Sequence, residues 1–339
     1  MSANSGQDIA PRYSMNSILR SVSRSFYLSI RLLPARLREP VGLAYLLART
    51  TDTVADTAQI PSDVRAEKLK QSSRAIQGGS DPNVIVDLAV SFAPLQKDAA
   101  ERTLVESFPE SLAWLERLGT ADRADVRALL DKITRGQMLD LQRFGEPSEV
   151  RALARATDLD EYTYLVAGCV GEFWTQVCFR HLRNFSRLSE EEMLGLGKRY
   201  GMGLQLINIL RDAGSDLRAG RCYFPEEALA AAGITPAQII QQPERFLPIY
   251  QKWTEKAETG LDAGMQYSLA IRNRRVRAAT VLPTLIGKRT LALLRNAGAT
   301  VLHRSIKIPR AKVRAMIAQL AITLASRQSI ERMFRESIR

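Results

Sequence analysis

The stretch AYLLARTTDTVADT, residues 44–57, places Asp52 and Asp56 four positions apart, directly after an apolar run. Residues four apart lie on one face of an α-helix, where two like charges destabilise the helix by about 0.2–0.5 kcal/mol. Arg49 and Tyr45 precede them at helical spacing, so a single polar stripe follows a helix that is otherwise apolar. The apolar sides of such a helix are buried. We therefore expect the stripe to face a polar cavity or a partner, and the aspartate pair to need a counter-charge.

A second expected helix also carries a polar stripe with two aspartates between apolar residues. In GLQLINILRDAGSDLRAGRCYFP, residues 203–225, polar residues recur at steps of three or four between leucines and isoleucines: Gln205, Asn208, Asp212 and Asp216. One such aspartate pair alone is more often part of a solvated helix surface than of a functional site. Four carboxylates that face one interior, however, cost several kcal/mol each unless cations balance them.

Magnesium is the cation that this pattern favours. Mg²⁺ typically binds one or two carboxylates and completes its shell with water and phosphate oxygens, so such a site implies a diphosphate substrate. Arginines interleaved with the aspartates could bind the same diphosphate through paired hydrogen bonds. They are Arg49, Arg211, Arg218 and Arg221.

The rest of the chain is also helical in pattern. Apolar residues recur at steps of three and four over residues 14–33, 40–56, 126–144, 160–181, 189–217, 243–269 and 276–294. Pro40 fits a first helical position, and Ser189 followed by three glutamates fits an N-cap with acids in the first turn. Strand alternation is hard to find.

No shift in composition marks a domain boundary, so we predict an all-α fold with one large helical bundle around a central cavity. The expected parts are a flexible N-terminal tail over residues 1–13, the catalytic bundle over residues 14–300, and a basic helical extension over residues 301–339.

Composition disfavours several classes of protein. The three cysteines, Cys169, Cys178 and Cys222, show neither paired spacing nor a C-x-x-C motif, and His181 and His303 lie far apart. Disulfide scaffolds, zinc clusters and histidine-activated nucleophiles are therefore poor candidates. The first residues lack the basic start and apolar core of a signal peptide. No apolar run reaches the roughly 18–20 residues that cross a bilayer.

Four segments resemble the signature segments of the squalene and phytoene synthase family, in the same order. They are SVSRSFYLSIRLLP (21–34), AYLLARTTDTVADT (44–57), YLVAGCVGEFW (164–174) and QLINILRDAGSDLRAGRCYFP (205–225). The resemblance extends over about residues 14–294. It implies the isoprenoid synthase fold and an enzyme that joins two prenyl diphosphates head to head.

The resemblance also implies roles for individual residues. Magnesium would be held by Asp52, Asp56, Asp212 and Asp216. Substrate would be bound by Ser23, Arg24, Phe26, Arg49, Gln205, Arg211 and Arg221. The catalytic residues would be Tyr45, Tyr162 and Arg49, and cofactor binding would involve Asn208 and Arg211.

Within the family, the first aspartate motif is most similar to the squalene synthase branch, since phytoene synthases tend toward paired acids of the DDVVD type. Eukaryotic squalene synthases often carry a third acid before the last aspartate, where this chain has Ala55. The resemblance thus implies a farnesyl-diphosphate farnesyltransferase that forms presqualene diphosphate from two farnesyl diphosphates and reduces it to squalene with NADPH. No Rossmann fingerprint is present, so the sequence neither requires nor excludes NADPH.

Two alternatives stay open. One is a non-reducing relative that makes presqualene diphosphate, dehydrosqualene or phytoene. The other is an assembly factor that keeps the fold without catalysis, against which the intact aspartate pairs argue.

Two glycines, Gly168 and Gly171, interrupt the apolar helix of the third segment, at a cost of up to about 1 kcal/mol each relative to alanine. Either close helix packing or a locally opened helix that leaves room for a prenyl chain would explain them. Ring faces that could favour a carbocation are supplied by Phe26, Tyr45, Phe173 and Trp174.

The net charge of +12 is concentrated at the C-terminal end. Residues 272–339 carry 16 Lys and Arg against two acids, which leaves 32 basic and 34 acidic residues, or −2, for the remainder. Within residues 308–328 an apolar stripe runs beside the basic residues: Val313, Met316, Ile317, Leu320 and Leu324. This helix either packs on the bundle or lies on an anionic membrane surface. We expect a cytoplasmic protein that binds farnesyl diphosphate and no nucleic acid, with peripheral membrane association as the open alternative.

Overall fold

The computed structural model describes residues 14–23, 27, 30–79, 82–145 and 149–336, and for residues 82–86 the backbone alone. The predicted tail, residues 1–13, lies outside the described residues, as do two of the predicted substrate-binding residues, Arg24 and Phe26.

Helices make up most of the described chain, and the predicted all-α fold is confirmed. The α-helices are α1 (Met15–Val22), α3 (Ala35–Asp56), α4 (Ser62–Ile76), α5 (Pro82–Ser91), α6 (Ala99–Glu106), α7 (Phe108–Arg117), α8 (Thr120–Phe144), α9 (Ala156–Thr163), α10 (Cys169–His181), α11 (Glu190–Arg218), α12 (Glu226–Ala231), α13 (Pro243–Ala270), α14 (Arg274–Ala297), α15 (Arg310–Ile322) and α16 (Arg327–Glu336). Short 3-10 turns are η1 (Ala93–Leu95), η3 (Pro236–Gln238) and η4 (Gly298–Leu302), and η2 (Tyr164–Gly168) is a π-helical segment. The strands are β1 (Arg151–Leu153) and β2 (Arg221–Pro225). Along the described chain, none of the helices combines the length and the apolar composition needed to span a bilayer.

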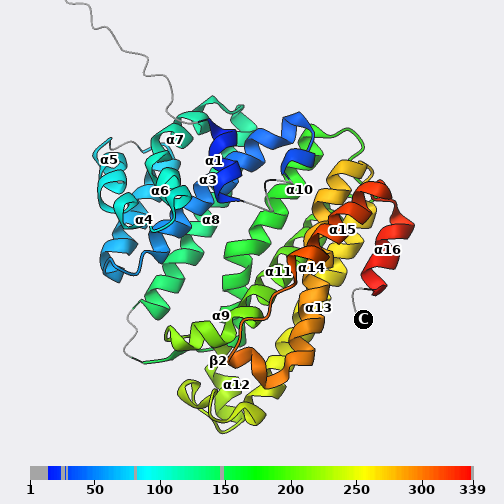
Figure 1. Ribbon diagram of the computed structural model, residues 1–339. Helices are drawn as coiled ribbons and strands as arrows, with labels where there is room; N and C mark the ends of the chain where they lie inside the picture. The colour runs from blue at the N-terminus through cyan, green and yellow to red at the C-terminus, as the bar shows by residue number, and fades with distance from the viewer. Residues whose placement is uncertain (1–13, 24–26, 28–29, 80–81, 146–148, 337–339) are drawn as a thin grey trace, which may run out of the picture.

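The helices form two walls that face each other (Figure 1). On one side α3 packs against α8 and α4, and on the other α11 packs against α10 and α13. One buried cluster joins Leu46 of α3, Leu130 of α8 and Val177 of α10, and a second joins Leu210 of α11 to Leu261 of α13. The two polar stripes predicted from the sequence therefore belong to opposite walls.

Local signals explain where the two helices that carry these stripes begin. The N-cap predicted for α11 is confirmed, because the Ser189 hydroxyl accepts a hydrogen bond from the Glu192 amide at 3.3 Å and the Glu192 carboxylate accepts one from the Ser189 amide at 2.9 Å. The prediction for Pro40 is wrong, since α3 begins at Ala35 and Pro40 lies inside the helix. Pro40 deprives the carbonyl of Arg36 of its helical partner, and Arg36 lies in the exposed first turn, where solvent can reach the chain.

A short parallel pair of strands follows α11. Gly220, at φ +80°, takes the left-handed conformation that ends the helix, and β2 then pairs with β1 so that Arg151 lies opposite Arg221. This pair fixes the backbone on which Arg221 and Tyr223 stand.

The last two helices pack on α14. Leu320 of α15 is 5% exposed, and Met316 and Ile317 pack against a cluster that contains Leu285 of α14. The packing alternative therefore holds for the middle of the predicted stripe. It is wrong for Leu324, which follows α15 and is 62% exposed.

Candidate active site

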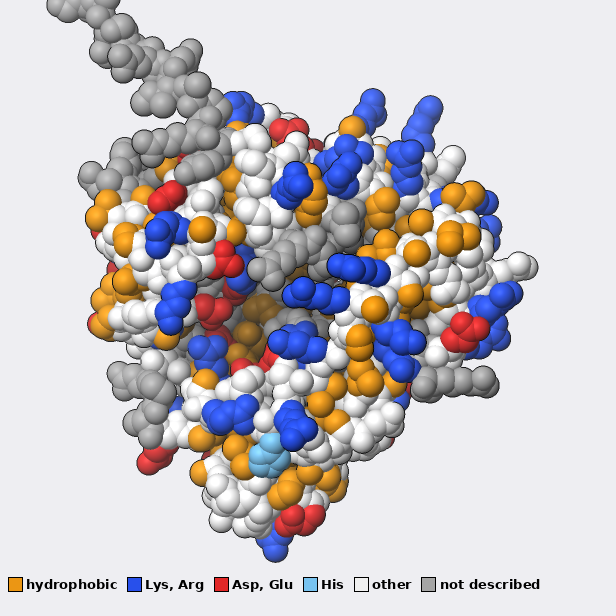
Figure 2. Space-filling model, in the orientation of Figure 1, with side chains coloured by type: hydrophobic (Ala, Val, Ile, Leu, Met, Phe, Trp, Pro, Cys, Tyr) orange, Lys and Arg blue, Asp and Glu red, His pale blue; other side chains and the backbone are white. Residues whose placement is uncertain are grey.

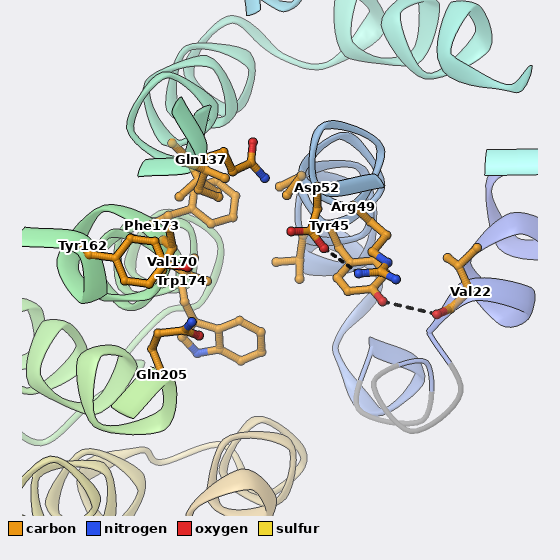
Figure 3. A pocket seen from close by; sticks show the side chains of 16 residues that line it. Val22, Tyr45, Arg49, Asp52, Gln137, Tyr162, Val170, Phe173, Trp174 and Gln205 are labelled. Carbon is orange, nitrogen blue, oxygen red and sulfur yellow. Dashed lines mark hydrogen bonds and ion pairs between the residues drawn. The ribbon is translucent and has the colours of Figure 1, made fainter. Parts of the chain in front are cut away.

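A cavity of about 430 Å³ opens between the two walls. Figure 2 shows the hollow on the face toward the viewer, with acidic side chains beside it and Lys and Arg across from it. Figure 3 shows Tyr45, Arg49 and Asp52 of α3 on one wall, facing Tyr162 and Gln205 on the other. The cavity thus brings together residues predicted from two distant segments.

Arg49 supplies the counter-charge that the first aspartate motif requires. Its Nη1 donates to Asp52 at 2.5 Å, and its Nε and Nη2 donate to Oε1 of Glu101 in α6 at 3.2 and 2.6 Å. The Thr53 hydroxyl donates to the other oxygen of Glu101 at 2.6 Å. Glu101 therefore holds the polar stripe of α3 in place. The sequence analysis missed it because no motif surrounds this residue.

The carboxylates of the first motif remain short of positive charge. Burial, together with the neighbouring charge of Asp56, raises the pKa of Asp52 to about 6 against the opposing effect of Arg49. Asp56, one turn later, has an exposed side chain. A divalent cation at this end of α3 would relieve the repulsion.

The second motif, Asp212 and Asp216, also combines an arginine partner with a carboxyl group whose pKa is raised. Arg211 binds Asp212 with two hydrogen bonds, from Nε at 3.0 Å and from Nη2 at 2.5 Å. Burial and the charge of Asp212 together raise the pKa of Asp216 to about 7. Nearer the cavity on the same helix, Gln205 lines the wall and accepts a hydrogen bond from the exposed Asn208 at 3.3 Å.

A fifth carboxylate, Asp140 of α8, connects the two motifs. The Tyr223 hydroxyl donates to Asp140 at 2.6 Å, and Arg221 Nη1 lies 3.4 Å from its other oxygen. Burial raises the pKa of Asp140, and the charge of Asp56 raises it further, while Asp140 in turn raises the pKa of Asp216. The carboxylates of both walls therefore share one electrostatic environment with Arg221. Sequence reasoning missed Asp140, since it stands alone within an ordinary amphipathic helix.

Tyr162 lies beside this group of carboxylates. Its ring stacks on Tyr223, with centroids 5.1 Å apart and planes at 25°. Burial raises the pKa of Tyr162 well above its usual value, and the charge of Asp140 raises it further. The phenol of Tyr162 is thus protonated at neutral pH and is available as a hydrogen-bond donor.

Tyr45 faces it from the opposite wall. The Tyr45 hydroxyl lies 3.5 Å from the carbonyl of Val22, at the end of α1. Ser23, a predicted substrate-binding residue, is the buried C-cap of α1, where its hydroxyl donates to the Leu19 carbonyl. The end of α1 is therefore adjacent to Tyr45, one of the predicted catalytic residues.

A second cavity of about 270 Å³, with mostly apolar lining, lies next to the first. The two cavities share Val170, Trp174 and Gln205. The indole nitrogen of Trp174 is buried and has no hydrogen-bond partner among the described residues. The side chain of Trp174 thus lies between the two cavities and lines both of them.

The glycine-containing segment shows both close helix packing and a locally widened helix. The chain widens to a π-helix over Tyr164–Gly168, a form of helix common at functional sites. Close packing accounts for Gly171, where an added Cβ would lie 2.0 Å from the Gly197 carbonyl oxygen of α11. Val166 and Val170 of this region line the large cavity.

Two residues singled out in the sequence lie away from the cavity. Ala55, noted above as a departure from the eukaryotic motif, is buried in a small cluster with Leu69 and Leu141. Arg218, predicted to bind diphosphate, instead donates to the carbonyl of Leu302 at 2.9 Å. This hydrogen bond of Arg218 therefore attaches η4 to the end of α11.

The carboxylates of the two motifs fit magnesium, which also binds water and substrate phosphates, better than a metal bound by protein side chains alone. Within the part of the chain that the structure describes, no three Asp, Glu, His or Cys side chains are grouped closely enough to hold an ion. Each motif instead offers two carboxylates, of which the half-buried Asp52 and Asp216 have pKa values raised chiefly by partial loss of water around them. Mg²⁺ is usually bound in this way, by one or two carboxylates together with water and substrate phosphates.

Comparison with known proteins identifies relatives that cover most of the chain. It is 27% identical to the presqualene diphosphate synthase of Rhodopseudomonas palustris over 310 residues, which cover 89% of this chain and 94% of that protein. It is 26% identical to the squalene synthase of Saccharomyces cerevisiae over 86% of this chain and 63% of that protein. A bifunctional lycopene cyclase/phytoene synthase of Arthroderma gypseum is 27% identical over 71% of this chain, but the match spans only 39% of that protein.

Solved structures share the fold. A ligand complex of TcSQS superposes with a TM-score of 0.72 at 20% identity and covers 96% of both chains. A dehydrosqualene synthase complex superposes with a TM-score of 0.62 at 20% identity, covering 91% of this chain and 95% of that one. The model of the family described as squalene/phytoene synthase matches residues 19–312. Since this match includes all four aspartates and nearly the whole bundle, the chain belongs to the squalene/phytoene synthase family.

Proposed function

We propose that this protein joins two farnesyl diphosphates head to head to give presqualene diphosphate and reduces that intermediate to squalene with NADPH. The observation that carries the proposal is the position of Asp140, which links the aspartate pairs of α3 and α11 electrostatically at one end of a cavity with apolar and aromatic walls. A charged mouth and an apolar interior suit a substrate with a diphosphate head and a prenyl tail.

The charged mouth would bind the diphosphates. Arg49, Arg211 and Arg221 carry guanidinium groups that can exchange their present carboxylate partners for phosphate oxygens. Magnesium would be bound by Asp52, Asp56, Asp212 and Asp216 and, when bound, would supply charge stabilisation for the leaving diphosphate. The positions of Arg24 and Phe26 in the site rest on the family resemblance.

The inner cavity would protect the reacting carbons. When the bond between C1 and oxygen of one substrate breaks, the diphosphate leaves with the electron pair and an allylic carbocation remains. Tyr162, held protonated, can donate a hydrogen bond to the departing oxygen. The rings of Tyr45, Phe173 and Trp174 line the space where the cation forms, so their faces can stabilise it while water is excluded.

The second candidate is a synthase that stops at presqualene diphosphate. The relative that the chain matches along 94% of its length carries that name. In the reducing function, Asn208 and Arg211 would contact the nicotinamide cofactor. Asn208 is exposed beside Gln205 at the cavity wall, which is compatible with a cofactor that enters from solvent.

The experiment that separates the candidates is incubation of the purified protein with farnesyl diphosphate and Mg²⁺, with and without NADPH, followed by mass spectrometry of the products. Squalene formed only with NADPH supports the reducing function. Presqualene diphosphate under both conditions supports the second candidate. If no head-to-head condensation product, dehydrosqualene and phytoene included, forms from farnesyl or geranylgeranyl diphosphate, the prenyltransferase proposal is wrong.

A further inference from the structure

Five arginines gather where the turn between α13 and α14 meets the turn between α15 and α16. We call them the arginine cluster: Arg187, Arg272, Arg274, Arg277 and Arg327. These turns lie at the upper right of the bundle in Figure 1, and Figure 2 shows Lys and Arg side chains along that edge. The cluster lies outside the lining of the active-site cavity.

Backbone carbonyls hold the inner members of the cluster. Arg277 is buried and donates to the Ile271 carbonyl from Nε at 3.0 Å and from Nη2 at 2.6 Å. Arg327 Nη2 donates to the same carbonyl at 3.0 Å, and Arg277 Nη1 reaches the Ala325 carbonyl at 2.9 Å. Two guanidinium groups thus share one carbonyl oxygen and tie the two turns together.

Where the structure describes the chain, no carboxylate forms a salt bridge with these arginines. Among the salt bridges of the described residues, none includes a member of the arginine cluster. Burial and the charges of Arg327, Arg274 and Arg187 together lower the pKa of Arg277 to about 10. Arg187, Arg272 and Arg274 are exposed. Their positive charge is therefore directed toward solvent and fits an anionic partner.

Apolar side chains project from the turn beside the cluster. Ile322 is 82% exposed and Leu324 is 62% exposed. Leu324 and Ala325 have φ values of +47° and +48°, a conformation in which glycine avoids the steric cost that other residues carry. The chain nevertheless places a leucine there, with its side chain in solvent, next to the residue whose carbonyl binds Arg277. A partner that buries aliphatic side chains would explain this choice.

We propose that the arginine cluster, together with Ile322 and Leu324, docks the protein on a bilayer that contains anionic phospholipid. The exposed arginines bind the phosphate groups, and the two aliphatic side chains enter the acyl boundary. A bilayer is favoured over nucleic acid because it offers anionic groups and an apolar layer at adjacent depths, whereas a phosphate backbone offers no place for two exposed aliphatic side chains. This docking does not depend on the reaction catalysed.

The test is sedimentation of the full chain with vesicles of phosphatidylcholine alone and of phosphatidylcholine with phosphatidylglycerol, at low and high salt. The wild-type protein is expected to bind only the anionic vesicles and to dissociate at high salt. Arg187→Glu with Arg274→Glu should weaken binding at least about tenfold, since each basic residue near the surface contributes about 1 kcal/mol. Neither side chain makes a hydrogen bond or ion pair within the described residues, so folding should persist.

The apolar part has its own test. Leu324→Gly removes the exposed side chain and relieves the left-handed backbone, so it should weaken vesicle binding while thermal stability is unchanged or higher. The matched control is Val90→Ser, which removes a side chain 66% exposed on α5, far from the cluster.

The control for charge is Lys97→Glu with Arg117→Glu, two exposed residues near α6 and α7 that change the net charge by the same amount. Retained binding in both controls supports the assigned surface. Equal loss in the charge control and the cluster variant would overturn it, as would wild-type binding to neutral vesicles or to none. Stronger binding to a single-stranded oligonucleotide than to anionic vesicles, lost in the cluster variant, would assign the cluster to nucleic acid instead.

Discussion

The hydroxyl of Tyr223 donates a 2.6 Å hydrogen bond to Asp140, and this contact links a strand that follows the second aspartate motif to a helix of the opposite wall. Tyr223 also stacks on Tyr162. The position of the proposed reaction-centre tyrosine is thus coupled to the charge that lies between the two motifs. Asp140 is placed to orient both Tyr162 and Arg221.

Replacing Asp140 by Asn should therefore reduce kcat by about 10–100-fold, the range observed when an outer partner of a functional group is lost. The change keeps the volume and removes the charge that Arg221 and Tyr223 face. Steady-state kinetics with product analysis would measure it. Asp131→Asn, an exposed residue of the same helix, is the control and should retain full activity. Equal kinetics in the two variants would show that Asp140 has no part in the site.

Asp52→Asn and Asp212→Asn should each lower turnover at least about 100-fold, because each removes a proposed magnesium ligand at constant volume. Circular dichroism should show an unchanged fold, since both side chains are partly exposed at the mouth. Titration with Mg²⁺ during the assay provides the decisive measurement. Normal rates in both variants at ordinary Mg²⁺ concentration would rule out the metal assignment.

Trp174→Ala should join the two cavities and admit a longer prenyl chain, since this indole separates a space of about 430 Å³ from one of about 270 Å³. We expect the ratio of kcat/KM for geranylgeranyl over farnesyl diphosphate to rise about tenfold. Phe173→Leu, at a residue that lines only the large cavity, is the comparison. A ratio that changes equally in both variants would contradict the partition role of Trp174.

Glu258 provides a prediction of pH dependence away from the site. Hydrogen bonds from Arg295, and then from Lys288, lower the pKa of Glu258 to about 2 from an ordinary value of 4.5. A carboxyl with a lowered pKa stabilises the fold above its unfolded pKa, so this contribution is present above about pH 4.5 and is lost as the pH falls toward 2.

The corresponding variant is Glu258→Gln. At pH 7 it should cost about 1–2 kcal/mol, a figure reduced for the partial exposure of Glu258, because it leaves Lys288, 7% exposed, without its carboxylate partner. Urea unfolding at pH 7 and at pH 2.5 would measure the difference. A destabilisation of the same size at both values would show that charge is not its cause.

Gly171→Ala should destabilise the fold by about 1–3 kcal/mol, because the added methyl group would meet the Gly197 carbonyl, a backbone atom that a change of rotamer does not move. Gly119→Ala is the control and should be neutral, since a methyl group added at Gly119 would meet no other atom within 4 Å. Thermal unfolding of the two variants provides the comparison. If both melt at the wild-type temperature, the two helices are less tightly packed than described.

The sequence predicted the helical fold and the residues of the two polar stripes because helical periodicity and charge spacing are local properties. It placed Arg49 beside Asp52 correctly, since these residues belong to the same helix. Glu101 and Asp140 were missed because each acts through contacts between elements far apart in the chain. No local pattern distinguishes them from solvated acids.

The errors have a similar origin. Proline is the residue type typical of a helix start, which is why the sequence predicts one at Pro40, but packing of α3 extends the helix to Ala35. Because of its spacing, the sequence analysis placed Arg218 among the arginines predicted to bind diphosphate. Its side chain instead donates a hydrogen bond to η4, which comes from a later part of the chain. Leu324 fits a continuous stripe by periodicity, but the helix ends two residues earlier.

The contact between Gly171 and Gly197 has a consequence for how enzymes of this design can change their substrates. Because α10 and α11 meet there backbone to backbone, neither glycine can be enlarged without separating the two helices. Directed evolution of chain length would instead act on residues whose side chains line the cavities, such as Trp174 of α10 and Leu129 and Ile133 of α8. Variants accepting new prenyl diphosphates should therefore accumulate substitutions at such side chains and leave the two glycines untouched.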